Sequence, residues 1–349
     1  MKIAFVVTSL AKKGPVIVIR DIISWIPTDW EITVYYFDKY IEIEFPVSVK
    51  LVRVPKFYYR VDLSQYDVVH SHLLRADLFC FWNRKSIHKS ISTMHSDVIR
   101  ELGISHGVVI GRTFGFLWSQ ILRLTDKVVF LTNNQRGKYP FIENCRVIYN
   151  GRPKVSDTLS IDNILSDIKR SNKNKIILGA CAYVVRRKGF TQVIDFLCTV
   201  LGEKYIFALV GDGPDIDRLK LYAEQRSVSS RCLFLGRTDN VNRYLPLFDI
   251  FVMTSYSEGM PLSLLEAASH KLPIVCSNLP VVEEIFDDEE IVFYELDNVF
   301  SLSNAIEIAR NSHNQLSNNV YQKFETYYTD KAMSLNYQSL YLECVDNAR

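Results

Sequence analysis

The chain has 349 residues, of which 48% are hydrophobic and 23% are charged, and its formal net charge is +2. These values are typical of a globular protein and exclude an intrinsically disordered chain. The length exceeds what one hydrophobic core usually supports, so we expect two domains. No apolar run reaches the length of a membrane span, and we expect a cytoplasmic, unprocessed protein.

The seven cysteines are scattered and include no Cys-x-x-Cys pair. This spacing argues against a disulfide framework and against a zinc site. We expect them to be small core residues in a reducing compartment.

Charge is divided unevenly along the chain. Residues 1–150 contain 20 Lys and Arg against 13 Asp and Glu, a net charge of +7, whereas residues 151–349 carry −5. A basic half suggests an anionic partner: a phospholipid surface, a pyrophosphate-linked acceptor or a nucleic acid. Scattered charges are usually only a solvated surface, so the asymmetry is weak support for such a partner.

The first half alternates apolar runs with amphipathic stretches, the pattern of buried parallel strands joined by helices. We expect strands at residues 2–8, 30–37, 49–54, 66–70, 90–94, 126–131 and 145–149. We expect helices at residues 15–26, 103–124 and 133–139.

The loop at residues 9–15, between the first strand and the first helix, contains one glycine, Gly14. A dinucleotide-binding dehydrogenase would have Gly-x-Gly-x-x-Gly at this place. No Walker-type Gly-Lys-Ser/Thr motif occurs in the chain either. The sequence therefore argues against both of these nucleotide-binding classes.

Polar residues close two of the predicted strands. His70, Ser71 and His72 end the fourth strand, and His95 follows the fifth. The carboxyl ends of parallel strands meet at the crevice where open α/β sheets bind ligands, so these residues are candidates for ligand contact. A histidine at a strand end is more often structural, and we rank His70, Ser71 and His72 behind His95.

Residues 103–124 are apolar and aromatic, with Arg112 and Arg123 among them. One interpretation is a core helix. The other is an amphipathic helix that rests in a membrane surface, with both arginines near lipid phosphate. Core packing is favoured.

A turn-forming cluster at residues 150–153 and a polar stretch at 154–175 mark the expected domain boundary. The alternation then resumes, which predicts two successive Rossmann-like domains. We expect strands at residues 176–182, 205–210, 232–235, 249–253 and 291–294. We expect helices at residues 191–201, 215–225, 241–247, 280–285, 299–310, 315–328 and 331–346.

Three cations, Arg186, Arg187 and Lys188, precede Gly189 where a helix follows a strand. Cations at a helix N-terminus oppose the helix dipole, so a functional role is favoured over a solvated basic turn. Charge-assisted bonds from such groups to a diphosphate contribute roughly 1.5 to 3 kcal/mol each.

The strand at 249–253 leads through a polar loop into a helix that we expect to begin at Pro261. The start of a helix offers unpaired backbone N–H groups to a phosphate, and Gly259 lets the backbone come close. Glu258 precedes this helix and Glu266 lies more than one turn inside it. Taken alone, Glu258 is better explained as a loop acid and Glu266 as a solvated residue facing His270.

The wider pattern resembles the Glu-x7-Glu signature of the retaining, GT-B-fold glycosyltransferases of family 4. The resemblance implies that Glu258 faces the donor sugar and that Glu266 binds the ribose of the nucleotide. It implies that the amides of the intervening segment hold the diphosphate; the residues concerned are Gly259, Met260, Pro261 and Leu262.

Other elements are similar to the same family: Asn150-Gly151 at the hinge, Gly211-Asp212-Gly213, Leu235-Gly236-Arg237 and Lys188-Gly189. In the family, a lysine and an arginine grip the diphosphate. Lys188 matches the lysine, but the usual arginine position falls near the uncharged Ala182 or Tyr183, so Arg186 or Arg187 would replace it. Gly14 is a partial match to the glycines near the donor phosphates, and His95 matches a histidine beside the donor sugar and the acceptor.

The resemblance implies a GT-B fold with three parts: an acceptor-binding domain at residues 1–152, a nucleotide-sugar-binding domain at 153–330, and a helix at 331–349 that packs back on the first domain. It implies front-face transfer with retention from a nucleotide-diphosphate sugar, with a UDP-sugar expected ahead of a GDP-sugar. We see no Asp-x-Asp motif of the kind that supports a metal ion in such a scheme, so no metal and no other cofactor are expected.

The expected acceptor is a glycan or a lipid-linked saccharide of O-antigen, capsule or lipopolysaccharide assembly. We expect action in the cytoplasm, with peripheral contact between the basic N-terminal domain and the inner membrane, and no nucleic-acid partner. Two alternatives stay open. One is a nucleotide-sugar epimerase of the same fold, and the other is a non-catalytic GT-B partner subunit.

Overall fold

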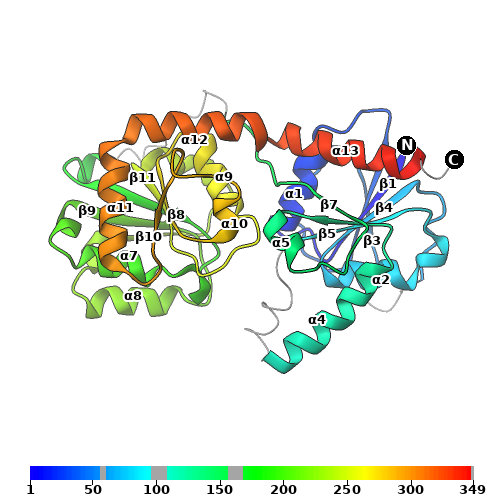
Figure 1. Cartoon of the computed structure of the whole chain (residues 1–349), viewed down its shortest axis with the longest axis horizontal. Coiled ribbons are helices and arrows are strands. Elements are labelled where there is room, and N and C mark those ends of the chain that lie inside the picture. Colours follow the sequence, from blue (N-terminus) through cyan, green and yellow to red (C-terminus); the bar gives the residue numbers. More distant parts are fainter. Residues whose placement is uncertain (56–59, 96–107, 156–167, 347–349) are drawn as a thin grey trace. The chain divides into compact units, whose positions relative to one another are not determined.

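The computed structural model of the chain describes residues 1–55, 60–95, 108–155 and 168–346. It divides into two compact units (Figure 1). Unit 1 combines Met1–Gly151 with Tyr328–Arg349, and unit 2 is Arg152–Tyr327. The divisions therefore fall after residues 151 and 327, where the sequence suggested 152 and 330.

Unit 1 contains a seven-stranded sheet in the order β3-β2-β1-β4-β5-β6-β7, with every pair parallel. Its strands are β1 (Lys2–Val7), β2 (Glu31–Tyr36), β3 (Lys50–Arg53), β4 (Val68–His72), β5 (Ser90–Met94), β6 (Lys127–Phe130) and β7 (Cys145–Val147). Strand β1 is a continuous apolar run after Lys2, and β4 beside it is buried along its whole length, because both faces of the sheet are covered.

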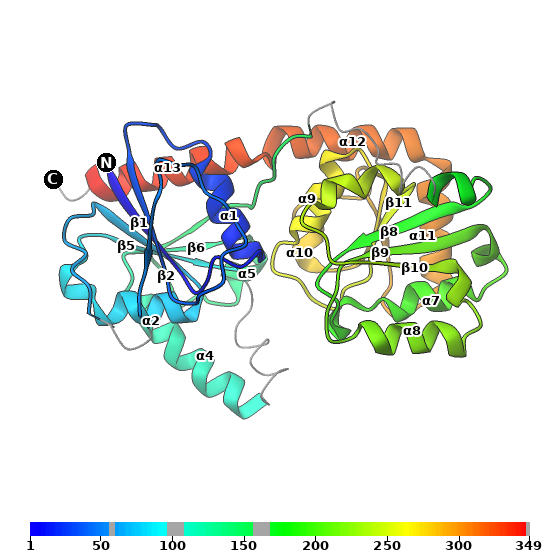
Figure 2. The ribbon, with the colours of Figure 1, turned by 180° about the vertical axis from the view of Figure 1, so that it is seen from behind.

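Helices cover both faces of this sheet, as Figures 1 and 2 show. They are α1 (Gly14–Ile23), α2 (Leu74–Trp82), α4 (Val108–Arg123), α5 (Asn133–Gly137) and α13 (Asp330–Asp346). Helices α1 and α13 pack together on one face, and α2 and α4 pack together on the other.

The last helix belongs to unit 1 although it follows unit 2 in the chain. One face of α13 is buried, and its residues are Tyr337, Leu340, Tyr341 and Cys344. The Ser334 hydroxyl donates to the carbonyl of Ile22 at the end of α1 (2.7 Å). The aromatic face of this helix therefore completes the core of unit 1.

Unit 2 contains a six-stranded parallel sheet in the order β10-β9-β8-β11-β12-β13. Its strands are β8 (Ile176–Cys181), β9 (Tyr205–Val210), β10 (Cys232–Gly236), β11 (Ile250–Met253), β12 (Ile274–Ser277) and β13 (Val292–Tyr294). Its α-helices include α7 (Thr191–Leu197), α8 (Ile216–Gln225), α9 (Leu262–Ser269), α10 (Pro280–Glu283), α11 (Val299–Asn311) and α12 (His313–Tyr327). The predicted α/β class with two doubly wound sheets is confirmed.

The strand order reverses direction once in each sheet. In unit 1 the chain moves outward from β1 on one side and resumes at β4 on the other; in unit 2 the same reversal separates β8 from β11. Loops leaving two such neighbouring strands diverge to opposite faces and leave room for a ligand between them. These two places are where a site is expected.

Three elements differ from the predictions. Helix α2 and strand β12 were not anticipated, and residues 241–247 form two 3₁₀ turns, Val241–Arg243 and Leu245–Leu247, rather than one helix. Pro246 lies within the second turn, where it removes a backbone donor that a longer helix would need.

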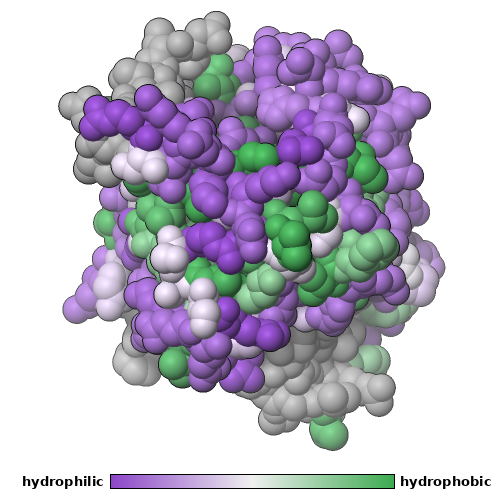
Figure 3. All heavy atoms as spheres, turned by 90° about the vertical axis from the view of Figure 1, so that its left-hand side faces the viewer, coloured by the Kyte–Doolittle hydropathy of each residue, from purple (hydrophilic) through white to green (hydrophobic). Residues whose placement is uncertain are grey.

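The face of unit 2 in Figure 3 is mostly hydrophilic, with hydrophobic residues scattered among the polar ones. Single exposed apolar side chains are normal on a globular protein. Those of unit 2 include Val200, Leu221 and Phe300.

Candidate functional site

The candidate site of unit 2 lies where β8 and β11 end side by side. The chain leaves β8 through a loop that contains the 3₁₀ turn Arg186–Lys188, and it leaves β11 through the loop that carries Glu258 and leads into α9. The reversal of strand order thus brings together the basic turn and the acidic loop, which are about 70 residues apart in the sequence.

Glu258 is held by two cations. Its Oε1 lies 2.7 Å from Nζ of Lys188, and its Oε2 lies 3.3 Å from Nη1 of Arg187. Burial alone would raise the pKa of the Glu258 carboxyl, but the charges of Lys188 and Arg187 outweigh it and hold the pKa below its ordinary value. The group is therefore an ionised carboxylate, and the three side chains together keep one positive charge.

Backbone geometry fixes the basic turn against β11. Gly189 has φ +65°, and a Cβ at this position would lie 2.1 Å from the carbonyl oxygen of Thr254. The hydroxyl of Thr254 donates to the carbonyl of Lys188 (2.8 Å), and the amide of Gln192 donates to the carbonyl of Thr254 (3.1 Å). A glycine is required here because only glycine combines this φ with so close an approach.

Arg186 is not part of this cluster. Its side chain is 83% exposed, and its Nε lies 3.8 Å from Asp215, a carboxylate that Arg218 already binds through two hydrogen bonds. Arg187 also donates to the carbonyl of Ser257 (2.6 Å). Of the two arginines proposed to replace the missing cation, Arg187 is the one beside Glu258.

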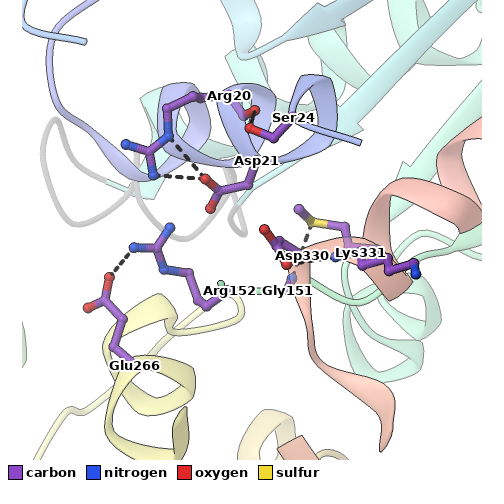
Figure 4. A network of polar contacts seen from close by, with 9 residues as sticks. Arg20, Asp21, Ser24, Gly151, Arg152, Glu266, Asp330 and Lys331 are labelled. Atoms are coloured by element: carbon purple, nitrogen blue, oxygen red, sulfur yellow. Dashed lines mark hydrogen bonds and ion pairs between the residues drawn. The ribbon is translucent and has the colours of Figure 1, made fainter. Parts of the chain in front are cut away.

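Glu266 is buried on α9, and it is not the solvated helix residue that its position alone suggested. Its Oε1 lies 2.8 Å from Nη2 of Arg152, whose side chain is also buried (Figure 4). Arg152 is the first residue of unit 2. In the sequence Arg152 is recognisable only as part of a turn-forming cluster, and nothing near it in the chain points to Glu266.

The segment between the two glutamates enters α9 without a side-chain cap. The helix begins at Leu262, and Pro261 occupies the N-cap position rather than the first helical position. No acidic residue lies in the first turn. The backbone N–H groups of this turn therefore keep the partial positive charge that suits an anion. Gly259 and Met260 precede Pro261, and Met260 is buried.

In unit 1, Gly14 is the first residue of α1, directly after the loop that leaves β1. His95 follows β5, next to the end of β4, so both lie at the carboxyl edge of the sheet. Nε2 of His95 is 2.7 Å from Nδ1 of His72. Burial lowers the pKa of His95 to about 3, so the ring is neutral at physiological pH.

The other polar residues at the end of β4 are buried and have structural partners. His70 lies within 2.8 Å of the Thr93 hydroxyl and of the Tyr341 hydroxyl. The Ser71 hydroxyl donates to the buried carboxylate of Asp77 (2.6 Å). These contacts hold the end of β4 in place, and the ranking of these residues behind His95 stays a prediction.

Helix α4 has one buried face and one exposed face. Trp118 and Leu122 belong to the core of unit 1, and the Trp118 indole donates to Asp77 (2.7 Å). On the other side, large apolar residues are each at least 56% exposed; these are Val109, Phe114, Phe116, Leu117 and, just past the helix, Leu124. The side chain of Arg112 and residues 103–107 of the predicted helix lie outside the described residues.

Two further features concern metals and membranes. Within the described ranges, no group of three or more His, Cys, Asp or Glu side chains is arranged to hold a metal ion. No helix in the same ranges combines the length and apolar character of a membrane span.

All seven cysteines are free thiols.

Comparison with known proteins gives consistent matches. The family described as glycosyl transferases group 1 matches residues 162–324. The O-antigen biosynthesis glycosyltransferase WclY of Escherichia coli is 29% identical over 356 residues, which cover 98% of each chain. Sucrose-phosphate synthase from Thermosynechococcus elongatus superposes with a TM-score of 0.81 at 15% identity and covers 99% of each chain.

A second solved structure, HepE of Anabaena in complex with UDP and glucose, has a TM-score of 0.78 at 15% identity. It covers 97% of this chain and 99% of its own. These likenesses confirm the predicted fold class.

Proposed function

We propose that the chain is a group 1 glycosyltransferase that transfers a sugar from a nucleotide-diphosphate sugar to an acceptor hydroxyl; the family match over residues 162–324, the likeness to WclY and the GT-B fold support this proposal. The observation that carries this proposal is the ionised Glu258 between Lys188 and Arg187, at the reversal of strand order in unit 2. The match to WclY supports an acceptor from O-antigen assembly.

The donor would bind in unit 2 around α9. Glu266 is buried on α9 beside Arg152, and we assign it the ribose hydroxyls of the nucleotide. The backbone N–H groups around Gly259, Met260 and Leu262 are assigned to the diphosphate. UDP is the preferred nucleotide of this proposal, and the UDP complex of the structurally similar HepE supports that choice.

Bond cleavage leaves negative charge on the β-phosphate of the nucleotide. Lys188, Arg187 and the first turn of α9 would stabilise this charge electrostatically, because they are fixed in place before the reaction. Glu258 would orient the donor sugar while it holds the two cations. Gly14 and His95 of unit 1 are assigned to donor and acceptor contacts. The scheme requires no metal and no other cofactor, and the proposed outcome is retention by front-face attack.

The exposed face of α4 favours a lipid-linked acceptor. No Asp or Glu occurs in residues 108–125, and Arg123 is exposed on the same helix as Phe114 and Leu117. Apolar side chains beside cations are the combination that binds the headgroup region of an anionic bilayer. Trp82, at the end of the neighbouring helix α2, is exposed too and is followed by the exposed Arg84 and Lys85.

Unit 1 is therefore proposed to rest on an anionic membrane through α4 and the end of α2, which suits a saccharide carried on an isoprenoid pyrophosphate at the cytoplasmic face of the inner membrane. A glycan acceptor in solution would not need this surface. The proposal includes no nucleic-acid partner.

Titration calorimetry tests the donor site. UDP, GDP, ADP, CDP and dTDP are titrated into the wild-type protein and into Glu266→Gln, which keeps the size of the side chain. We expect UDP to bind, and the variant to bind roughly 10- to 150-fold more weakly, the loss of about 1.5 to 3 kcal/mol of charge-assisted bonds.

Two outcomes would overturn the proposal. If none of the five nucleotides bound, the protein would be a non-catalytic partner subunit. If the nucleotide sugar were converted to its epimer without an acceptor product, the protein would be an epimerase, an alternative that the transferase relatives do not favour. If wild type and Glu266→Gln bound UDP with equal affinity, the assignment of Glu266 to the ribose would be refuted, but the proposed function would not be.

A further inference from the structure

Three histidine rings stand in a row at the carboxyl ends of β4 and β5. The ring centroids of His70 and His72 are 4.3 Å apart, and those of His72 and His95 are 5.0 Å apart with an interplanar angle of 29°. His70 and His72 are completely buried, while His95 is partly exposed at the end of the row. His95 is thus the member of the row that a ligand can reach.

The middle ring is the one whose hydrogen bonding is incomplete. Nδ1 of His72 lies 2.7 Å from Nε2 of His95, so one of these two nitrogens carries a proton and donates a hydrogen bond, and the other accepts that bond. Within the part of the chain that the structure describes, Nε2 of His72 is buried and has no hydrogen-bond partner. The hydrogen-bonded pair of His72 and His95 therefore contains an unpaired nitrogen on His72.

All three rings are neutral. Burial lowers the pKa of His70 to about 3, burial lowers the pKa of His72 well below its ordinary value, and the neighbouring rings add to the effect. A neutral imidazole has one N–H and one acceptor nitrogen. The proton of His72 is therefore on either Nδ1 or Nε2.

The unpaired nitrogen decides between these two forms. A proton on Nε2 of His72 would leave a buried N–H without an acceptor, and orphaned buried donors are among the rarest features of native proteins. With the proton on Nδ1, the only unpaired atom is an acceptor, which is tolerated better. The His72 N–H then points along the hydrogen bond to His95.

We propose that His72 donates from Nδ1 to Nε2 of His95 and thereby fixes His95 as the tautomer that carries its proton on Nδ1. His72 is a positioning residue in this arrangement. His95 offers a neutral N–H donor to an oxygen of the ligand, and it does not act as a general base through Nε2. The part of this inference that concerns transfer rests on the proposed function, whereas the tautomer belongs to the free protein.

His70 keeps the middle ring in place from the other side. Its two nitrogens are both engaged, by the hydroxyls of Thr93 and Tyr341, and the Thr93 hydroxyl lies 3.1 Å from that of Tyr337. These contacts fix the orientation of His70, on which His72 packs. The His70 ring cannot turn to offer a hydrogen-bond partner to Nε2 of His72 without breaking its own hydrogen bonds to Thr93 and Tyr341.

The tautomer can be measured in the free, full-length protein labelled with ¹⁵N-histidine. Long-range ¹H–¹⁵N correlation spectra distinguish the two neutral tautomers and the charged ring for each of the seven histidines. The His95 signals are assigned by their absence in His95→Gln, and the exposed His88 and His313 serve as internal references. We expect the Nδ1–H form for both His72 and His95. An Nε2–H form or a charged ring at His95 would overturn the proposal, whatever the activity of the protein.

Two variants of His72 test the positioning role. Asn in place of His72 keeps an amide donor near the position of Nδ1, whereas Leu removes it. We expect His72→Asn to keep the Nδ1–H form of His95 and His72→Leu to lose it, with kcat reduced roughly two- to tenfold in His72→Leu and KM for the donor unchanged. An unchanged His95 tautomer in His72→Leu, or an altered tautomer with unchanged kcat, would contradict the assigned role. Thermal melts followed by circular dichroism verify folding, and the wild-type spectrum decides the tautomer even if neither variant folds.

Discussion

Nζ of Lys188 lies 2.7 Å from Oε1 of Glu258, and this pair joins the loop after β8 to the loop after β11. Both side chains are largely buried, so the attraction between them is screened less than on a protein surface. The same contact that fixes the two loops keeps a cation where a diphosphate would need it.

Removal of this cation is expected to impair transfer more than folding. In Lys188→Met, Arg187 still neutralises Glu258, but one of the groups that stabilise the leaving phosphate is lost. We expect kcat to fall about 10²- to 10³-fold, the usual effect of removing one preorganised electrostatic group. The measurement is initial-rate kinetics with a UDP-sugar donor. Lys220→Met, which removes an exposed lysine on α8, is the control and should keep wild-type kinetics. A kcat within threefold of wild type in Lys188→Met would argue against its role.

Because Arg152 and Glu266 form a buried ion pair, we expect the effects of changing them on the free energy of unfolding to be strongly coupled. Either single change, Arg152→Met or Glu266→Leu, removes the 2.8 Å ion pair while one buried charged side chain remains, and should lower the free energy of unfolding by about 3 to 5 kcal/mol. The double variant leaves no such charge and should be more stable than the sum of the two single effects predicts. Urea denaturation of all four proteins measures this. Additive losses would show that the two side chains are not coupled.

Gly189 is expected to tolerate no side chain. Alanine there would adopt an unfavourable φ and place its Cβ 2.1 Å from a backbone oxygen that hydrogen bonds hold in place. The left-handed backbone alone costs about 1 to 2 kcal/mol, and the clash adds to it, so Gly189→Ala should lower both the melting temperature and the donor affinity. Gly137→Ala is the matched control, because nothing lies within 4 Å of a Cβ at the end of α5. Calorimetric melts that show equal losses in the two variants would refute the explanation.

Asp77 is expected to raise the free energy of unfolding as the pH falls below about 6. Burial raises the pKa of this carboxyl to about 6, although Ser71, Ser92 and Trp118 donate to it. In the unfolded chain its pKa is about 3.9, so between these values the folded protein binds a proton that the unfolded chain does not. The contribution of Asp77 to the free energy of unfolding therefore rises by about 2 to 3 kcal/mol as the pH falls from about 6 to about 4.

The difference between wild type and Asp77→Asn isolates this effect, because the other titrating groups are common to both. The variant is expected to lose the indole bond of Trp118, at a cost of about 1 to 3 kcal/mol near neutral pH, and to fall further behind as the pH is lowered. Urea melts across this pH range provide the test. A deficit that shrinks toward acid pH would show that Asp77 has a lowered pKa instead.

The exposed face of α4 is expected to bind anionic vesicles. Phe114→Ser combined with Leu117→Ser removes apolar side chains that are more than half exposed, so the fold should lose little stability. We expect wild type to sediment with phosphatidylglycerol-containing vesicles at low salt and the double variant to stay in the supernatant. Leu221→Ser, on an exposed site of α8 in unit 2, should sediment like wild type. Wild type that remains in solution at low salt, where electrostatic attraction is strongest, would exclude the membrane surface.

Much of the fold could be predicted because most strands are continuous apolar runs between turn residues. Strand β12 escaped because its four residues directly follow Pro273 and a helix, too short a run to show a period. Helix α2 escaped because Asp77 lies on its buried side, which breaks the apolar stripe that marks an amphipathic helix. The first miss comes from the shortness of the strand, and the second from a tertiary environment of Asp77 that no local pattern records.

Only the residues of the candidate site that lie in recognisable sequence motifs could be predicted. The sequence singled out Glu258, Lys188 and Arg187, and the structure brings these three together. Arg152 could not be found, because its partner Glu266 is remote in the chain and only the fold makes them neighbours. Arg186 differs from Arg187 only in the direction that the 3₁₀ turn gives its side chain.

Unit 1 is assembled from the two ends of the chain, since Tyr337 and Tyr341 of its core are synthesised after the whole of unit 2. During translation the sheet of unit 1 therefore lacks the aromatic cover of His70 and Phe5 until Tyr341 has been synthesised. Unit 2, a continuous segment, has no such delay. A stop codon just after the codon of Tyr327 would consequently damage unit 1, which begins to be made first, and spare unit 2.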